Sequence, residues 1–323
     1  MSKAIRMHEV GGPGVLKWES VPTPQPGPTE ALVRHEAVGL NYIDVYFRTG
    51  LYKTALPATP GLEGAGVVLA VGSEVKDLAV GDRVAYQGGP LGAYATERVI
   101  PADRLVKLPD TIDFKTGAAM MLQGMTAEYL LLRTFKVQKG QTVLVHAAAG
   151  GVGLILCQWA KHIGATVIGV VSTPDKAELA KAHGAHHVII GHATLAADVK
   201  RITEGAMVPV VYDAVGKDTF MASIDCLAPL GMMVTYGSAS GPVPPVDTAM
   251  LAAKGSLFLT RPTLATYTAS RADIVKSAAA LFDVVASGAV KIRVNQTFPL
   301  AEAAAAHTAL EARQTTGSTV LIP

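Results

Sequence analysis

The chain has 323 residues, of which 50% are hydrophobic and 17% charged, and its 28 basic residues nearly balance 26 acidic ones. This composition excludes an intrinsically disordered chain, and without any basic run nucleic acid is not expected as a main partner. The N-terminus has no apolar signal core, and the most hydrophobic window, 143–160, is broken by polar residues and glycines, so neither export nor a membrane span is expected.

The length of the chain predicts two domains. Its two cysteines, Cys157 and Cys226, each lie in an apolar segment that looks helical, and neither has a second thiol nearby in the sequence. We therefore expect two buried free thiols and a reducing, cytoplasmic location.

Residues 1–120 alternate short apolar stretches with glycine and proline, which predicts an all-β region. The segment 21–28 contains four prolines and is expected to be an extended connection. The expected strands are Ala4–Glu9, Ala31–Val38, Gly64–Val71, Arg83–Tyr86 and Ala93–Ile100.

From about Gln123 to Pro262 the pattern changes to strands that alternate with helices, which predicts a doubly wound parallel sheet. The expected strands are Thr142–Val145, Thr166–Val171, His187–Ile190, Val208–Asp213, Met232–Tyr236 and Ser256–Thr260. After Pro262 we expect a tail that packs back on the first domain. Its elements are a helix at 271–287, a strand at 289–294, a helix at 300–313 and a strand at 319–322.

One glycine-rich stretch, residues 146–153 (HAAAGGVG), stands between the strand Thr142–Val145 and an expected helix at 152–163. A tight turn of this kind lets backbone N–H groups and the positive helix N-terminus bind a pyrophosphate. In the fingerprint GxGxxG the glycines fall at Ala148, Gly150 and Gly153, so the first is replaced. On this stretch alone, a glycine-rich turn without a nucleotide remains an equal alternative.

The next strand, Thr166–Val171, bears on which dinucleotide would bind. An NAD site usually has a carboxylate at the end of this strand for the ribose 2′-hydroxyl. Here Ser172, Thr173 and Lys176 follow instead, and they suit the negative charge of a 2′-phosphate. We therefore predict NADPH, with a solvated Lys176 paired to Asp175 as the alternative.

Six stretches together resemble the medium-chain dehydrogenase/reductase superfamily. Within it, the chain is similar to the zinc-independent, NADPH-dependent quinone oxidoreductases related to zeta-crystallin, and the resemblance covers the whole chain. Among these relatives, alanine at position 148 is usual. The stretches are residues 39–46 (GLNYIDVY), 61–66 (GLEGAG), 80–84 (VGDRV), 146–153, 211–216 (VYDAVG) and 254–262 (KGSLFLTRP).

The chain departs from the zinc alcohol dehydrogenases at the positions where they bind metal. Asn41 stands where the catalytic cysteine would be, and Leu62 where the ligand histidine would be, so that only Glu63 of that motif remains. Two distant cysteines cannot form a structural zinc lobe, and the histidines lack partners at ligand spacing. We therefore expect no metal.

The resemblance implies an α/β fold of two parts. A GroES-like β-rich catalytic domain would take residues 1–122, a Rossmann NADPH-binding domain 123–262, and the return to the catalytic domain 263–323. It also implies a homodimer through the edge strand Ser256–Thr260, with a covered edge in a monomer as the alternative.

The resemblance further implies NADPH-dependent reduction of a quinone by hydride transfer without a metal. A conjugated carbonyl polarised by hydrogen bonds suits such a site. The alternatives are a reductase of α,β-unsaturated aldehydes or ketones and, from another class, an RNA-binding or crystallin-like structural protein. Near-neutral charge argues against RNA.

Asn41 and Tyr46 are the catalytic candidates implied by the resemblance, as hydrogen-bond donors to cofactor or substrate, with Tyr46 or solvent as the proton source. Asn41 could instead stabilise a loop, Tyr46 could be a packing residue, and Asp44 is more readily a helix cap. His192 follows Gly191 where relatives often have a tyrosine near the 2′-phosphate. The implied cofactor contacts are Asn41, Tyr46, Thr126, Gly150, Gly151, Val152, Ser172, Thr173, Lys176, Tyr236, Gly237, Ser238, Ala239, Leu259, Thr260, Arg261 and Arg313, of which the two arginines could also form surface ion pairs.

Overall fold

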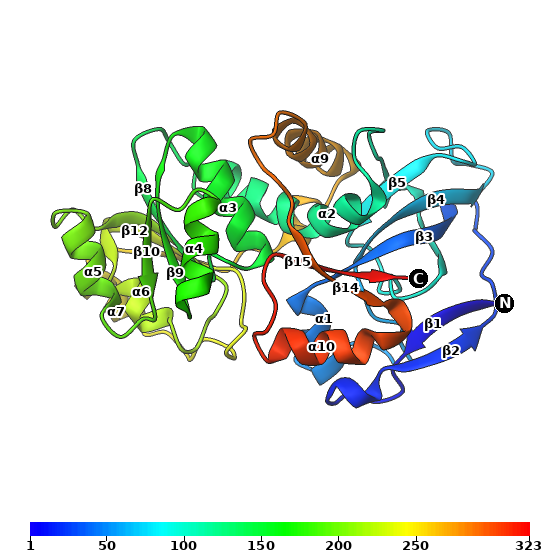
Figure 1. Cartoon of the computed structure of the whole chain (residues 1–323), viewed down its shortest axis with the longest axis horizontal. Coiled ribbons are helices and arrows are strands. Elements are labelled where there is room, and N and C mark those ends of the chain that lie inside the picture. Colours follow the sequence, from blue (N-terminus) through cyan, green and yellow to red (C-terminus); the bar gives the residue numbers. More distant parts are fainter. The chain divides into compact units, whose positions relative to one another are not determined.

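The computed structural model describes residues 1–323, and the chain divides into two compact units (Figure 1). Unit 1 comprises Met1–Met125, Thr268–Ala286 and Ile292–Pro323, and unit 2 comprises Thr126–Tyr267 and Ser287–Lys291. No helix combines the length and the apolar character needed to cross a membrane.

Unit 1 is built on a seven-stranded sheet and a separate two-stranded one. In the larger sheet the order is β14-β15-β3-β4-β5-β7, with β6 paired to β3, and all pairings are antiparallel except that of β14 with β15. Valine, leucine and isoleucine side chains from β3, β4, β6 and β15 fill the core of this unit. The strands are β1 (Ser2–Arg6), β2 (Lys17–Val21), β3 (Glu30–Leu40), β4 (Glu63–Val71), β5 (Arg83–Gln87), β6 (Glu97–Pro101), β7 (Val106–Lys107), β14 (Val294–Pro299) and β15 (Ser318–Ile322).

Four helices lie between these strands in the sequence. Asn41 caps the first of them, and Gly50 ends it in the left-handed conformation, with φ 82°, which favours glycine. The helices are α1 (Tyr42–Thr49), α2 (Phe114–Tyr129), α9 (Arg271–Ala286) and α10 (Ala303–Glu311), with 3₁₀ turns at Pro13–Val15, Ala102–Arg104 and Leu300–Glu302. Helix α2 runs on into unit 2, where one π-helical segment, Leu130–Thr134, extends it.

Unit 2 is a parallel sheet whose strands alternate with helices (Figure 1). The strand order is β10-β9-β8-β11-β12-β13. The first strand of this unit therefore lies beside the fourth, and at such a reversal of order the carboxyl ends of the strands form a ligand crevice. The elements are β8 (Thr142–His146), α3 (Gly151–Ile163), β9 (Thr166–Val171), α4 (Pro174–Ala182), β10 (His187–Ile190), α5 (Leu195–Ile202), β11 (Val208–Asp213), α6 (Phe220–Ile224), β12 (Leu227–Thr235), α7 (Thr248–Ala253), β13 (Phe258–Thr260) and α8 (Leu264–Tyr267).

Several expected elements differ from the structure. The strand expected at 289–294 is wrong, because Gly288 turns the chain and β14 begins only at Val294, where β15 offers a pairing partner. The strand expected from Ala93 begins at Glu97, where pairing with β3 starts. Cys226 lies between α6 and β12, not in a helix, because β12 begins at Leu227. Both cysteines are buried and free, as expected.

Candidate active site

The glycine-rich turn joins β8 to α3 at the carboxyl end of the sheet of unit 2. Gly150 is the N-cap of α3, and a Cβ on Gly153 would lie 2.2 Å from the carbonyl oxygen of Ala147, so only glycine allows the helix to begin so close to the turn. No acidic residue occupies the first turn of α3 and no side chain caps it. Its N–H groups are therefore available to an anion.

The alanine that replaces the first glycine of the fingerprint has a structural counterpart on the next strand. Ala148 is fully buried, and its Cβ lies 2.9 Å from the position that a Cβ on Gly169 would take. Gly169 on β9 therefore provides the space that the methyl group of Ala148 fills. The turn can keep its shape with alanine at position 148 because the facing residue on β9 is a glycine, which has no side chain.

The residues expected at the 2′-phosphate lie between β9 and α4. Ser172 and Thr173 are exposed and Lys176 is half-buried, all within the loop and first turn that follow β9. The hydroxyl oxygen of Thr173 accepts a hydrogen bond from the Lys176 backbone N–H at 3.4 Å and thereby caps α4. His192 is exposed in the loop after β10. This corner carries a helix N-terminus, two hydroxyls and one lysine, together with the exposed carboxylate of Asp175 in the first turn of α4.

A buried polar cluster links the carboxyl ends of β8 and β11. Asp213 ends β11 and its carboxylate accepts four hydrogen bonds, from the backbone N–H groups of Val215 and Gly216 and from the hydroxyls of Thr219 and Ser223, at 2.7–3.1 Å. Ser223 Oγ also lies 2.9 Å from Nε2 of His146, the last residue of β8. Since the one hydroxyl proton of Ser223 goes to Asp213, His146 donates through Nε2.

This cluster supports the segment that follows β12. The backbone N–H groups of Tyr236 and Ala239 donate to the carbonyl oxygens of Asp213 and Ala214, at 2.8 and 3.2 Å. A Cβ on Gly237 would lie 2.4 Å from the same Ala214 oxygen, so glycine permits the close approach. The predicted cofactor segment 236–239 is thus held against the loop that Asp213 organises.

A cavity of about 300 Å³ lies beside this segment within unit 2. Thr235, at the end of β12, faces it with a buried hydroxyl that has no hydrogen-bond partner. The cavity is otherwise mainly apolar, and three predicted contacts, Ser238, Leu259 and Arg261, are among its lining residues. Thr260 and Leu259 belong to the edge strand β13, and Thr126 lies on α2.

In unit 1, Asn41 and Tyr46 both belong to the start of α1. Asn41 is buried as the N-cap, and it forms a capping box with Asp44, whose carboxylate accepts from the Asn41 backbone N–H at 2.9 Å. Asp44 therefore has the capping role that the sequence favoured. Tyr46 is buried between Tyr42 and Tyr52, with ring centroids 5.5 and 5.3 Å away.

Two carboxyl groups beside Asn41 are fully buried. Desolvation raises the pKa of Glu63 to about 8, although hydrogen bonds from Asn41 and the backbone of Leu122 lower it. Desolvation likewise raises the pKa of Asp44 to about 7, against hydrogen bonds from the Asn41 backbone and Tyr94. Tyr94 Oη also lies 3.0 Å from His307 Nε2, so Asp44 is linked to α10.

Arg313 follows α10 in the left-handed region, with φ 59°. Nearby on the same helix, Glu311 forms an ion pair at 2.7 Å with Arg48, which is fully buried on α1. Of the predicted site residues, Asn41, Tyr46 and Arg313 thus belong to unit 1, and all the others belong to unit 2.

Sequence reasoning missed the polar partners that orient these residues: His146, Asp213, Thr219 and Ser223 in unit 2, and Glu63 and Gln123 in unit 1. A signal existed for two of them. Asp213 ends a buried parallel strand, where ligand crevices form, and Glu63 was visible as the remnant of a metal motif. The structure brings no three His, Cys, Asp or Glu side chains together as a metal site.

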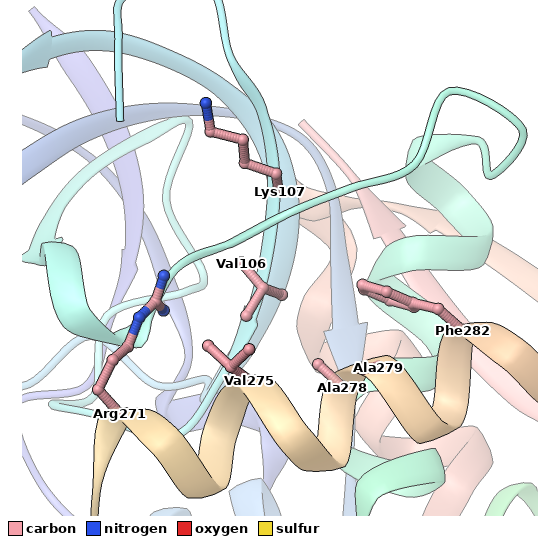
Figure 2. A pocket seen from close by; sticks show the side chains of 7 residues that line it. All are labelled: Val106, Lys107, Arg271, Val275, Ala278, Ala279 and Phe282. Carbon is pink, nitrogen blue, oxygen red and sulfur yellow. The ribbon is translucent and has the colours of Figure 1, made fainter. Parts of the chain in front are cut away.

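A second cavity, of about 250 Å³, lies in unit 1 between β7 and α9 (Figure 2). Its wall is apolar, with Val106 facing Val275, and Lys107 and Arg271 stand at its rim. Both cations are already engaged, because Lys107 pairs with Asp82 and Arg271 with Asp77. No residue expected in the active site lines this cavity.

Known proteins are similar to this chain over its whole length. Residues 27–110 match the family model of the alcohol dehydrogenase GroES-like domain, and residues 151–282 match that of the zinc-binding dehydrogenases. The chain is 52% identical to a quinone oxidoreductase of Pseudomonas aeruginosa, with 100% of both chains covered. It is 47% identical to a 2-haloacrylate reductase of a Burkholderia species, with 100% of this chain and 99% of that protein covered.

The structural comparison agrees. The crystal structure of Escherichia coli quinone oxidoreductase complexed with NADPH superposes with a TM-score of 0.97, at 44% identity and with 100% of both chains covered. These similarities confirm the resemblance predicted from the six motifs and the fold class of a GroES-like part with a Rossmann part. The chain belongs to the quinone oxidoreductase family of the medium-chain dehydrogenase/reductase superfamily.

Proposed function

We propose that this protein reduces quinones with NADPH by hydride transfer and without a metal. The observation that carries the proposal is the full-length similarity to quinone oxidoreductases, one of them solved with NADPH, in a chain that retains the glycine turn at the strand reversal. In this assignment unit 2 binds NADPH and unit 1 supplies the groups that act on the acceptor.

The residues of unit 2 fit a dinucleotide phosphate. Gly151 and Val152 would hold the pyrophosphate with their N–H groups, and Gly150, whose N–H donates to the Ala147 carbonyl oxygen at 2.8 Å, would let the phosphates approach because it has no side chain. Ser172, Thr173 and Lys176 would hold the 2′-phosphate. Thr126, the segment 236–239, the segment 259–261 and Arg313 would contact the rest of the cofactor, as the resemblance implies.

Bound NADPH supplies the hydride, and the protein's own part is to orient and polarise the acceptor. The amide of Asn41 has an N–H left for an oxygen on which negative charge develops. The hydroxyl of Tyr46 is the group we assign to proton donation or to a hydrogen bond with substrate or cofactor.

Reduction of an activated carbon–carbon double bond is the second candidate. It is favoured by the 47% identity to a protein named 2-haloacrylate reductase, whose name describes an α,β-unsaturated acid. The test is NADPH oxidation with 1,4-benzoquinone, 9,10-phenanthrenequinone, a 2-alkenal and crotonyl-CoA, with NADH as the paired control. Fast turnover of quinones with NADPH supports the first candidate. Turnover of only the alkenal or the thioester would replace it by the second.

The choice of NADPH over NADH depends on Lys176. Lys176→Ala is expected to weaken NADPH binding by about 1–3 kcal/mol, since it removes one charge-assisted phosphate contact, and to leave NADH binding nearly unchanged. Lys181→Ala, on the same helix and paired with Glu178 at 2.8 Å, is the matched control. Equal losses for both cofactors in fluorescence titrations would contradict the 2′-phosphate assignment.

We further infer a homodimer and a cytoplasmic location. Edge strand β13 has Phe258 exposed by 56%, and Leu230 on β12, whose N–H donates to Gly255 just before β13, is exposed by 68%. A second copy would cover apolar surface and an open strand edge. Phe258→Lys should convert a dimer into a monomer in light scattering, with Met221→Lys as the exposed control. A wild-type monomer at micromolar concentration would contradict the dimer. The two free thiols support a reducing compartment.

A further inference from the structure

Glu63 is the surviving residue of a metal-binding motif, and its environment is unusual. It is fully buried at the start of β4 and forms no ion pair with any basic side chain. Its Oε2 accepts a hydrogen bond from Asn41 Nδ2 at 2.6 Å, and its Oε1 accepts one from the backbone N–H of Leu122 at 2.8 Å. An unpaired buried carboxylate is costly, and here two donors that can only donate hold it in place.

The backbone is shaped to admit this carboxyl group. Gly39 on β3 lies two residues before Asn41, and a Cβ there would be 2.3 Å from Glu63 Oε2 and 2.3 Å from the carbonyl oxygen of Ala118 on α2. Any side chain at position 39 would displace Glu63 from Asn41. The sequence motifs 39–46 and 61–66 are therefore in contact through Glu63, which lies against Gly39 and accepts a hydrogen bond from Asn41.

The amide of Asn41 is fixed from its other side as well. Its Oδ1 accepts from Gln123 Nε2 at 3.1 Å, and Gln123 Oε1 accepts from the hydroxyl of Ser318 at 2.8 Å. The hydrogen bonds of this polar chain thus run from Gln123 through Asn41 to Glu63, and the one hydroxyl proton of Ser318 has two acceptors within reach, Gln123 Oε1 and the Ala119 carbonyl oxygen. Glu63 Oε2 faces Asn41 Nδ2 as an acceptor, while Asn41 Oδ1 accepts from Gln123 Nε2 and, through the capping box, from the Asp44 backbone N–H. These contacts together fix which way the Asn41 amide faces.

We propose that Glu63 is a positioning residue that sets the sense of the Asn41 amide, so that the second N–H of Nδ2 is presented to the molecule being reduced or to its cofactor. The proposal rests on the proposed function, in which Asn41 polarises the acceptor. If the Asn41 amide turned over, its Oδ1 would take the place of Nδ2. An oxygen there would repel the negative charge that develops during hydride transfer.

Glu63→Gln tests this because the new amide can be satisfied only by reversing the polar chain. The amide introduced at position 63 must accept from Leu122 N–H with its oxygen and donate to Asn41 with its nitrogen, so Asn41 and Gln123 turn over and Ser318 becomes the acceptor. Because the turned Asn41 no longer accepts from the Asp44 N–H, we expect an unfolding midpoint lower by about 2–4 °C. We expect a kcat/KM for 1,4-benzoquinone lower by about tenfold or more. Glu97→Gln is the matched control and should keep full activity. It makes the same substitution in the same unit, at a carboxylate that accepts from the hydroxyl of Ser2.

The transposed variant Glu63→Gln/Gln123→Glu separates positioning from structure. It preserves charge, volume and every hydrogen bond along the polar chain, but the carboxylate now lies on the other side of Asn41. A merely structural role predicts restored activity. The proposal predicts a stable protein whose kcat/KM stays at least about tenfold low, and activity within about twofold of the wild type would overturn it.

A measurement without turnover keeps this test separate from the proposed function. In wild-type protein one side-chain amide proton of Asn41 should show the downfield NMR shift of a hydrogen bond to carboxylate, and Glu63→Gln should remove it. Unchanged Asn41 resonances would contradict the positioning of Asn41 by Glu63. If this shift behaves as expected but the wild type reduces no quinone, the proposed function fails while the positioning stands.

Discussion

Glu63 in unit 1 and Asp213 in unit 2 are both fully buried carboxylates, but their hydrogen-bond partners differ in kind. Asp213 accepts from two backbone N–H groups and from the hydroxyls of Thr219 and Ser223. Those hydroxyls can rotate and become acceptors, and the imidazole of His146 can change tautomer with them. Glu63 accepts only from the side-chain amide of Asn41 and the backbone N–H of Leu122. The backbone N–H cannot become an acceptor, and the Asn41 amide can do so only if it turns over.

Two carboxyl groups that are equally buried can therefore have different roles. The cluster of unit 2 can adapt to replacement of Asp213, because its two hydroxyls can rotate, and it supports the loops that follow β11 and β12. The amides of Gln123 and Asn41 in unit 1 can turn over only together, so a change at Glu63 is transmitted to both. Variants at Asp213 and Gly39 test this contrast directly, and a variant at His307 tests how burial in unit 1 affects a titratable group.

The largest effect is expected at Asp213. Asp213→Leu leaves the N–H groups of Val215 and Gly216 buried without an acceptor and should lower the free energy of unfolding of unit 2 by about 4 kcal/mol. Asp213→Asn should cost about 1 kcal/mol or less, because its NH₂ group can donate to the rotated hydroxyls of Thr219 and Ser223. Urea unfolding followed by fluorescence and circular dichroism measures both. Equal costs for Leu and Asn would show that the hydroxyls do not adapt.

Gly39→Ala should have the next largest effect. Its Cβ would meet Glu63 Oε2 and the Ala118 carbonyl oxygen, and we expect a loss of about 3 kcal/mol in the free energy of unfolding of unit 1. Gly12→Ala in the same unit is the control, since a Cβ there has no atom within 4 Å. If the two variants are equally stable in urea, Glu63 is not seated against β3 as described, and the rigid side of the contrast is lost.

The smallest effect concerns pH. Burial lowers the pKa of His35 and of His307 to about 3, so both are neutral in the folded protein, whereas in the unfolded chain they titrate near the ordinary value of 6.5. Between pH 6.5 and 3 the unfolded state therefore binds more protons, and these histidines cost stability as the pH falls. The raised pKa values of Glu63 and Asp44 act in the opposite direction, up to about 8 and about 7.

A variant at His307 separates the effect of the buried histidines on stability from that of the buried carboxyl groups. From about pH 7.5 to about pH 5.5, His307→Gln should lose about 1 kcal/mol less of its free energy of unfolding than the wild type, since one neutral buried histidine is gone. His187→Gln, at an exposed position, should behave as the wild type does. A pH dependence of His307→Gln that is identical to the wild type would mean that His307 is not held neutral by burial.

The two units were not equally predictable from the sequence. The strands Thr166–Val171, His187–Ile190 and Val208–Asp213 were expected with the bounds that the structure shows, because strands in a parallel sheet covered by helices appear as unbroken apolar runs. In unit 1 the bounds depend on which partner strand is present. The segment 289–294 looked like a strand, yet pairing with β15 begins only at Val294.

The site divides in the same way. The glycine turn could be predicted because its chemistry belongs to the backbone of one short continuous stretch, residues 146–153. The link from Ser318 through Gln123 and Asn41 to Glu63 joins distant segments, and no local pattern shows which side-chain atoms will meet. The assignment of Lys176 to a 2′-phosphate stays a prediction, because its test requires the cofactor.

The position of β15 has a consequence for the order of events during synthesis. Unit 2 is nearly one continuous segment, whereas β15 is made after it and pairs with β3 at Val38, Gly39 and Leu40, next to Asn41. Ser318, the start of the polar chain, arrives with the same strand. A nascent chain on the ribosome can therefore fold its nucleotide-binding unit first. Under the proposed function, the nascent chain could bind NADPH before it can reduce a quinone. Catalytic activity would begin only after β15 pairs with β3.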